Sequence, residues 1–68
     1  MNIYTKLIAE GLQIEIAEAK EIQTFIECFY DDFRWGNSSI IKIIKVAKQA
    51  QLDMAKPTFN GWKALVNA

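Results

Sequence analysis

Residues 3–16, IYTKLIAEGLQIEI, decide the fold, because their apolar residues fit both a β-hairpin and a helix. A two-residue turn at Glu10-Gly11 would close the hairpin. Leu7 then faces Ile14, so apolar pairs share one side of the ribbon while opposite charges meet across the other side. This division is typical of an antiparallel pair with one face on a core. We therefore predict a hairpin over residues 3–16.

A helix over the same residues is the competing interpretation. Ile3, Leu7 and Ile8 recur at helical spacing, and Gly11 is suited to the positive φ of a helix end. Glu-Gly is also a weaker hairpin turn than Asn-Gly or Asp-Gly. The choice sets the fold class: the hairpin gives an α+β domain, and the helix gives an all-α bundle of three or four helices.

The rest of the chain is predicted to be helical. In residues 18–33 the apolar residues recur at three and four positions on one face, and Gly36 follows as a terminator. They are Ile22, Phe25, Ile26, Phe29 and Phe33. Residues 39–55 form the next predicted helix, capped by Asn37 or Ser38 and stopped before Pro57.

The helix over residues 39–55 carries more apolar surface than one packing face requires. Its predicted buried stripe is Ile40, Ile43, Ile44, Ala47, Ala50 and Met54. Ile41 and Leu52 flank that stripe on one edge. After Pro57, Thr58 is expected to cap a short last helix whose apolar face holds Phe59, Trp62, Leu65 and Val66. The predicted architecture is one domain, residues 1–68, with the hairpin packed on two amphipathic helices and closed by this short helix.

A chain of 68 residues has a thin core, since only about 60% of the unfolded surface is buried at this size. One cysteine, Cys28, and no histidine leave neither an intrachain disulfide nor a Cys/His zinc cluster to support it. Yet 51% of the residues are hydrophobic, and the mean hydropathy is +0.03. Uncovered apolar surface is therefore expected, and it favours self-association or a protein partner.

Membrane and secretory signals are also absent from the sequence. Lys or Glu interrupts every apolar run well before the length of a spanning helix, and no basic segment followed by an apolar one marks the N-terminus. We expect a cytoplasmic protein that does not enter a membrane.

Charge is separated along the chain although the net charge is zero. Residues 1–33 hold two cations and seven anions, a net of −5, and residues 34–68 hold six cations and one anion, a net of +5. The two halves are expected to pack together and partly neutralise each other. The alternative is that the basic half meets a polyanion or the acidic half meets a basic surface.

Catalysis is not predicted. Without histidine, a general base would have to be a carboxylate or lysine with a strongly shifted pKa, and nothing marks one. Glu27 and Asp31 are expected to form ordinary acidic surface. Cys28, among acidic neighbours, is expected to be structural and partly buried. The three glycines are too far apart for a phosphate-binding loop, so we predict no catalytic residue, metal, cofactor or small-molecule substrate.

The predicted function is a non-enzymatic protein–protein interaction module: a small regulator, inhibitor or assembly adaptor, acting as a homodimer or in a hetero-complex. The candidate interface residues are Tyr4, Ile8, Trp35, Ile41, Leu52 and Trp62. A small nucleic-acid-binding regulator is the second hypothesis. Its candidate residues in the basic half are Arg34, Lys42, Lys45, Lys56 and Lys63.

Overall fold

The chain folds as a small helical bundle. The computed structural model describes residues 2–66, which contain four α-helices and two short 3₁₀ turns. In chain order these are α1 (Ile3–Leu12), α2 (Ile16–Phe29), η1 (Trp35–Asn37), α3 (Ile40–Met54), η2 (Pro57–Phe59) and α4 (Trp62–Val66). Residues 2–66 contain no strand, so the predicted α+β fold with an N-terminal hairpin is wrong. The helical alternative is what the structure shows.

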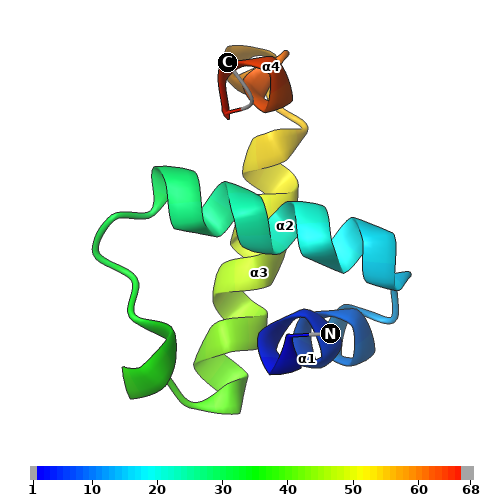
Figure 1. Cartoon of the computed structure of the whole chain (residues 1–68), viewed down its shortest axis with the longest axis vertical. Helices are drawn as coiled ribbons and strands as arrows, with labels where there is room; N and C mark the ends of the chain where they lie inside the picture. The colour runs from blue at the N-terminus through cyan, green and yellow to red at the C-terminus, as the bar shows by residue number, and fades with distance from the viewer. Residues whose placement is uncertain (1, 67–68) are drawn as a thin grey trace.

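The arrangement is simple (Figure 1). α2 crosses α3, α1 packs against both of them near the start of α3, and α4 lies at the other end of α3. The face of α3 toward α1 and α2 carries Ile43, Ala47 and Ala50, all buried, which we call its inner face.

Residues 3–12 form a helix whose buried residues all lie on one face, and this face packs on the core. Thr5, Ile8 and Ala9 are buried and Leu12 is half-buried, at the spacing of one helix face. The side chain of Asn2 caps α1 by accepting a hydrogen bond from the Tyr4 N–H at 2.8 Å.

α1 ends two residues later than a stop at Gly11 would place it. Gln13 has the left-handed conformation, with φ 55°, and its N–H donates to the carbonyl of Glu10. The N–H of Ile14 donates to the carbonyl of Ala9 at 3.0 Å, which completes a Schellman ending. Gly11 therefore lies inside the helix, where its missing side chain makes room for Ile44 of α3.

α2 is shifted toward the N-terminus relative to the predicted helix over residues 18–33. It begins at Ile16 and ends at Phe29, so Phe33 lies in the connection, where its ring packs edge-on against Trp35 at 4.8 Å. α3 matches its prediction closely. Its cap is Ser39, whose hydroxyl accepts from the Lys42 N–H at 3.2 Å, and not the predicted Asn37 or Ser38.

Phe25 is the centre of an aromatic cluster that attaches the C-terminal segment to α2. Its side chain is fully buried, and its ring lies 4.7 Å from Phe29, 5.0 Å from Phe59 and 5.3 Å from Trp62 between centroids. Such tilted and edge-on pairs are favourable beyond the area they bury. At the other end of the core, the hydroxyl of Thr5 donates to the side-chain carbonyl of Gln23, so this buried polar pair is satisfied.

Candidate protein-interaction surface

The structure divides the six predicted interface residues into three kinds. Ile8 is fully buried and Trp62 is 6% exposed, so both belong to the core, and the prediction that they face a partner is corrected. Tyr4 and Trp35 are half-buried, and their rings lie 5.0 Å apart, which joins η1 to α1. Their main contacts are within the molecule. The remaining two residues, on α3, are exposed.

An exposed row of residues runs along the side of α3 that faces away from the inner face. Its members are Ile41, Lys45, Lys48 and Leu52, which follow one another at four, three and four residues and therefore share one side of the helix. We call them the outer stripe. Ile41 is 70% exposed and Leu52 is 59% exposed. These are large apolar side chains on a helix whose inner face is already buried.

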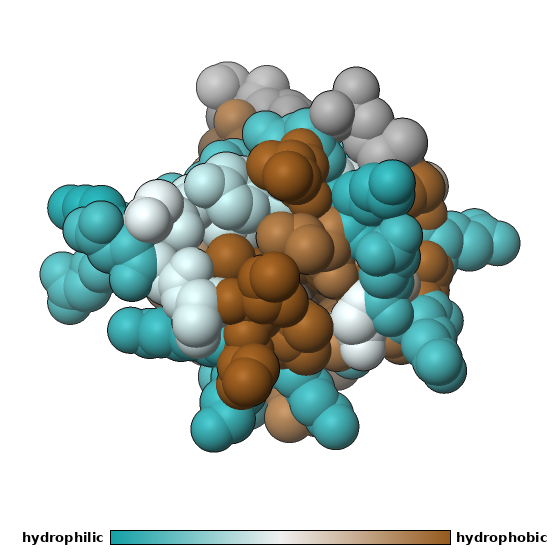
Figure 2. Space-filling model, turned by 90° about the horizontal axis from the view of Figure 1, so that it is seen from below, coloured by the Kyte–Doolittle hydropathy of each residue, from teal (hydrophilic) through white to brown (hydrophobic). Residues whose placement is uncertain are grey.

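A second apolar surface lies where α1 meets the start of α3. Figure 2 shows hydrophobic residues gathered in the middle of this face, with hydrophilic residues around them. Ile3 of α1 and Ile40 of α3 are 68% and 57% exposed, and Leu7 and Ile44, one turn further along each helix, are half-buried. We call these four residues the lower patch. Ile40 was expected in the buried stripe of α3, but it is the first residue of that helix and remains mostly exposed.

The five predicted nucleic-acid residues differ in whether the fold already gives their side chains a partner. The ammonium of Lys63 pairs with Glu21 of α2 at 2.6 Å, and that of Lys56 pairs with Asp53 at 3.1 Å. The guanidinium of Arg34 donates to the backbone carbonyls of Asp31 and Phe33. Three of the five predicted cations therefore already have partners in the fold.

Lys42 and Lys45 are the two members of that set whose side chains form no ion pair or hydrogen bond with other residues of 2–66. Lys48, which was not predicted, joins them on the exposed side of α3. It could have been found from the sequence, since it lies seven residues after Ile41. Within residues 2–66 Lys63–Glu21 is the one ion pair between the acidic and basic halves, so most of the separated charge is not neutralised by ion pairing inside the described chain.

The densest polar cluster ties α2 to the end of α3. The hydroxyl of Tyr30 donates to one carboxylate oxygen of Asp53 at 2.5 Å, and Gln49 and Lys56 contact the other oxygen at 3.1 Å. Burial, followed by the hydrogen bond to Asp53, raises the pKa of Tyr30 well above its ordinary value. The Tyr30 hydrogen bond, then that of Lys56, lowers the pKa of Asp53. A carboxylate held in this way stays ionised and is a weak base, so the cluster acts as a structural tie.

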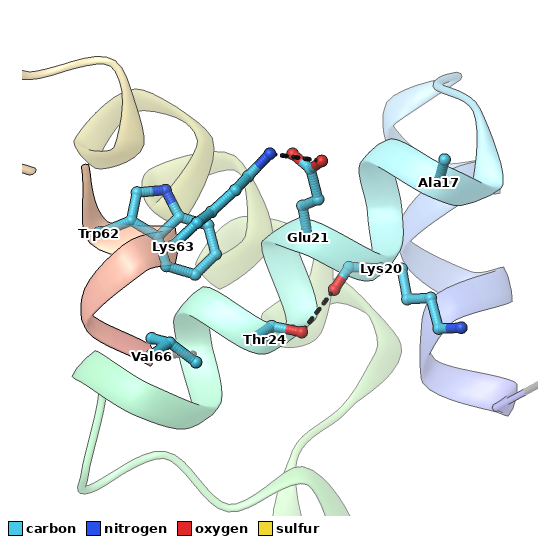
Figure 3. Close-up of a pocket in the computed structure, with 7 residues that line it drawn as sticks. All are labelled: Ala17, Lys20, Glu21, Thr24, Trp62, Lys63 and Val66. Atoms are coloured by element: carbon cyan, nitrogen blue, oxygen red, sulfur yellow. Dashed lines mark hydrogen bonds and ion pairs between the residues drawn. The ribbon is translucent and has the colours of Figure 1, made fainter. Parts of the chain in front are cut away.

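A groove of about 340 Å³ lies between α2 and α4 (Figure 3). The Lys63–Glu21 ion pair spans it, and the Thr24 hydroxyl donates to the backbone carbonyl of Lys20. The polar groups that line the groove therefore bind one another, and the Lys20 side chain points away from Trp62. Nothing in this arrangement selects a polar ligand.

Three further features are the exposure of Cys28, the placement of metal-ligating side chains and the character of the helices. Cys28 is exposed and not partly buried, because it lies on the outer side of α2. No three metal-ligating side chains within residues 2–66 lie close enough to share an ion. Among the helices of the described chain, none combines the length and the apolar character needed to cross a bilayer.

Comparisons of the chain with protein-family models, with curated proteins and with solved structures each give no match.

Proposed function

We propose that the protein is a non-enzymatic interaction module, a small regulator, inhibitor or adaptor that acts by occupying a surface on a protein partner. The exposure of Ile41 and Leu52 on the outer stripe carries this proposal. Both residues add apolar area to a helix that already has a complete inner face, so folding gives no reason for them. Residues that break the pattern of an otherwise consistent helix are commonly functional.

Seven large hydrophobic side chains of the described residues are exposed, Ile41 and Leu52 among them. A partner that covers such side chains would stabilise a domain whose core is thin.

An affinity capture with matched variants tests the proposal. The tagged protein is incubated with lysate of the host that encodes it, with and without nuclease, and bound material is identified by mass spectrometry and nucleic-acid staining. We expect a stoichiometric protein that survives nuclease and is lost with Ile41→Asp or Leu52→Asp. Leu65→Asp is the control, because Leu65 is 74% exposed but lies on α4. A partner retained equally by all three variants would refute a role for the outer stripe.

Self-association is part of the same proposal, and the lower patch is the surface best suited to it. Its four residues are uncharged, so two copies that meet there bring no like charges together within the patch. Sedimentation equilibrium should show a dimer that dissociates when Ile3 and Ile40 are both changed to lysine. A wild-type protein that stays monomeric at high concentration removes the homodimer. We also propose a cytoplasmic location, supported by the single cysteine, which suits a reducing compartment.

Nucleic-acid binding is the second candidate, favoured by the exposed lysines Lys42, Lys45 and Lys48. Two or three phosphate contacts would make the logarithm of affinity fall with the logarithm of salt concentration at a slope of about −2 to −3. Changing Lys42, Lys45 and Lys48 to glutamate should then abolish binding without unfolding the protein, because all three are exposed and none forms an ion pair within residues 2–66. Unchanged affinity for DNA and RNA in this variant excludes the candidate.

A further inference from the structure

We infer that the outer stripe binds an acidic amphipathic helix of a protein partner, whose apolar residues contact Ile41 and Leu52 while its carboxylates meet Lys45 and Lys48. This inference rests on the proposed function and specifies the chemistry of the partner.

The spacing of the two apolar residues fits a helix lying along α3. Ile41 and Leu52 are eleven residues apart on one side of the helix, which corresponds to about 16 Å along its axis at 1.5 Å per residue. A partner helix that places apolar residues at three- and four-residue spacing covers this length in three turns. Lys45 and Lys48 lie between the two contact points, so the middle of the interface is basic.

The charge of α3 selects an acidic partner. α3 contains three lysines and one acid, Asp53, and Asp53 is already bound by Tyr30, Gln49 and Lys56. No acidic side chain of residues 2–66 pairs with Lys45 or Lys48. Carboxylates from a partner would supply the missing charge, and complementarity of this kind raises association rate and specificity.

A second copy of the chain fits this stripe poorly. If two α3 helices pack antiparallel along their outer stripes, Lys45 and Lys48 of one copy meet the same lysines of the other, and like charges oppose each other. The acidic α2 does not supply the required pattern either. Its outward side carries small or polar residues, with Ala17, Thr24 and Cys28 exposed or half-buried there, and no row of large apolar side chains.

Nucleic acid also matches the stripe less well than an acidic helix does. Ile41 and Leu52 would lie against phosphates and gain nothing from burial. The stripe contains neither arginine nor an aromatic residue, which are the usual readers of bases.

Fluorescence anisotropy with a defined probe tests the inference. The probe is a labelled synthetic helix with leucines at three- and four-residue spacing on one side and glutamates beside them. We expect saturable binding that weakens about tenfold for Lys45→Glu/Lys48→Glu, from the loss and reversal of two ion pairs. A second peptide, with lysines in place of the glutamates, should bind this double variant better than it binds the wild type. Ile41→Asp should weaken both interactions.

The control makes the same change of charge elsewhere. Lys6→Glu/Lys20→Glu alters two lysines on α1 and α2, away from the outer stripe, and should leave peptide affinity within about twofold. Circular dichroism of each variant confirms that it is folded, which is expected because all four lysines are exposed.

Three results would overturn the inference. The first is the absence of saturable binding to the acidic peptide. The second is a failure of the lysine-containing peptide to bind Lys45→Glu/Lys48→Glu better than it binds the wild type. The third is tighter binding to duplex DNA or to phosphatidylserine vesicles than to the acidic peptide. If the acidic peptide fails while the lysate capture still returns a partner sensitive to Ile41→Asp, the interaction function stands and only the acidic-helix chemistry is wrong. If both fail, the proposed function fails with it.

Discussion

The contact between Gly11 and Ile44 gives a sharp prediction about how α1 packs on α3. A Cβ atom added at Gly11 would lie 2.6 Å from both Cδ1 and Cγ1 of Ile44, and 3.4 Å from its Cγ2. Separations this short require a neighbouring group to move. Glycine at position 11 therefore allows the close approach of α1 and α3, since its backbone is helical and any residue could adopt that conformation.

Two opposing effects set the magnitude for Gly11→Ala. Alanine is favoured over glycine inside a helix by about 1 kcal/mol. Forcing an extra methyl group into a packed contact costs about 1–3 kcal/mol. The free energy of unfolding should therefore fall by up to about 2 kcal/mol. When Ile44 is also alanine, the clash is gone, and Gly11→Ala should stabilise that background by about 1 kcal/mol.

A double-mutant cycle measures both quantities. Urea denaturation of the wild type, the two single variants and the double variant gives the coupling energy between the positions, which should be about 1–3 kcal/mol. Gly36→Ala is the control, because a Cβ there meets nothing within 4 Å. If Gly11→Ala stabilises the wild type by the full helix-propensity gain, Ile44 does not restrict the site and this account of the α1–α3 contact is refuted.

Three further predictions concern the helix ends and the polar tie. Tyr30→Phe should flatten the pH dependence of urea stability at both extremes. The raised pKa of Tyr30 gives stability that is present below pH 10.0 and is lost as pH rises. The lowered pKa of Asp53 gives stability that is present above pH 3.8 and is lost as pH falls. Identical profiles for the variant and the wild type would argue against the tie. Gln13→Gly should raise the unfolding free energy by about 0.5–1 kcal/mol, because Gln13 has φ 55°, and a lower melting temperature would contradict this. Ser39→Ala should cost about 1 kcal/mol in the same denaturation assay through loss of the cap, whereas no change would show that the hydrogen bond to Lys42 contributes little.

Local signals were sufficient to predict α3 from the sequence. The predicted range 39–55 differs from Ile40–Met54 by one residue at each end, because a serine cap and Pro57 bound the segment chemically. The predicted cap, Asn37 or Ser38, was wrong because it depends on η1. Ser38 follows that turn and its hydroxyl donates to the carbonyl of Arg34, so the next serine, Ser39, caps the helix.

The N-terminal segment could not be assigned from its own residues. Leu7 and Ile14 support a hairpin, while Ile3, Leu7 and Ile8 support a helix, and both patterns are present in the same stretch. The decision is made by contacts with α3, where a helix with glycine at position 11 fits against Ile44. No propensity scale contains that tertiary contact.

Dependence on nonlocal packing also explains which candidate interface residues were correctly predicted to be exposed. Ile41 and Leu52 were identified correctly as exposed because they exceed what one face of α3 can bury, which is a local argument. Ile8 and Trp62 were misplaced because their burial depends on nonlocal packing. Ile8 becomes internal only when α1 is a helix, and Trp62 becomes internal only when α4 docks on Phe25.

The separated charge of the sequence and the exposed apolar pair on α3 point to the same face of the molecule. Among residues 2–66 a single ion pair forms between the acidic and basic halves, and Lys45 and Lys48 have no acidic partner. Folding also leaves Ile41 and Leu52 in solvent beside them. Polar residues at positions 41 and 52 would be equally compatible with the exposed side of α3, so the apolar character of Ile41 and Leu52 has no explanation inside the fold. A partner that is both acidic and apolar explains both features at once, whereas a polyanion explains only the lysines.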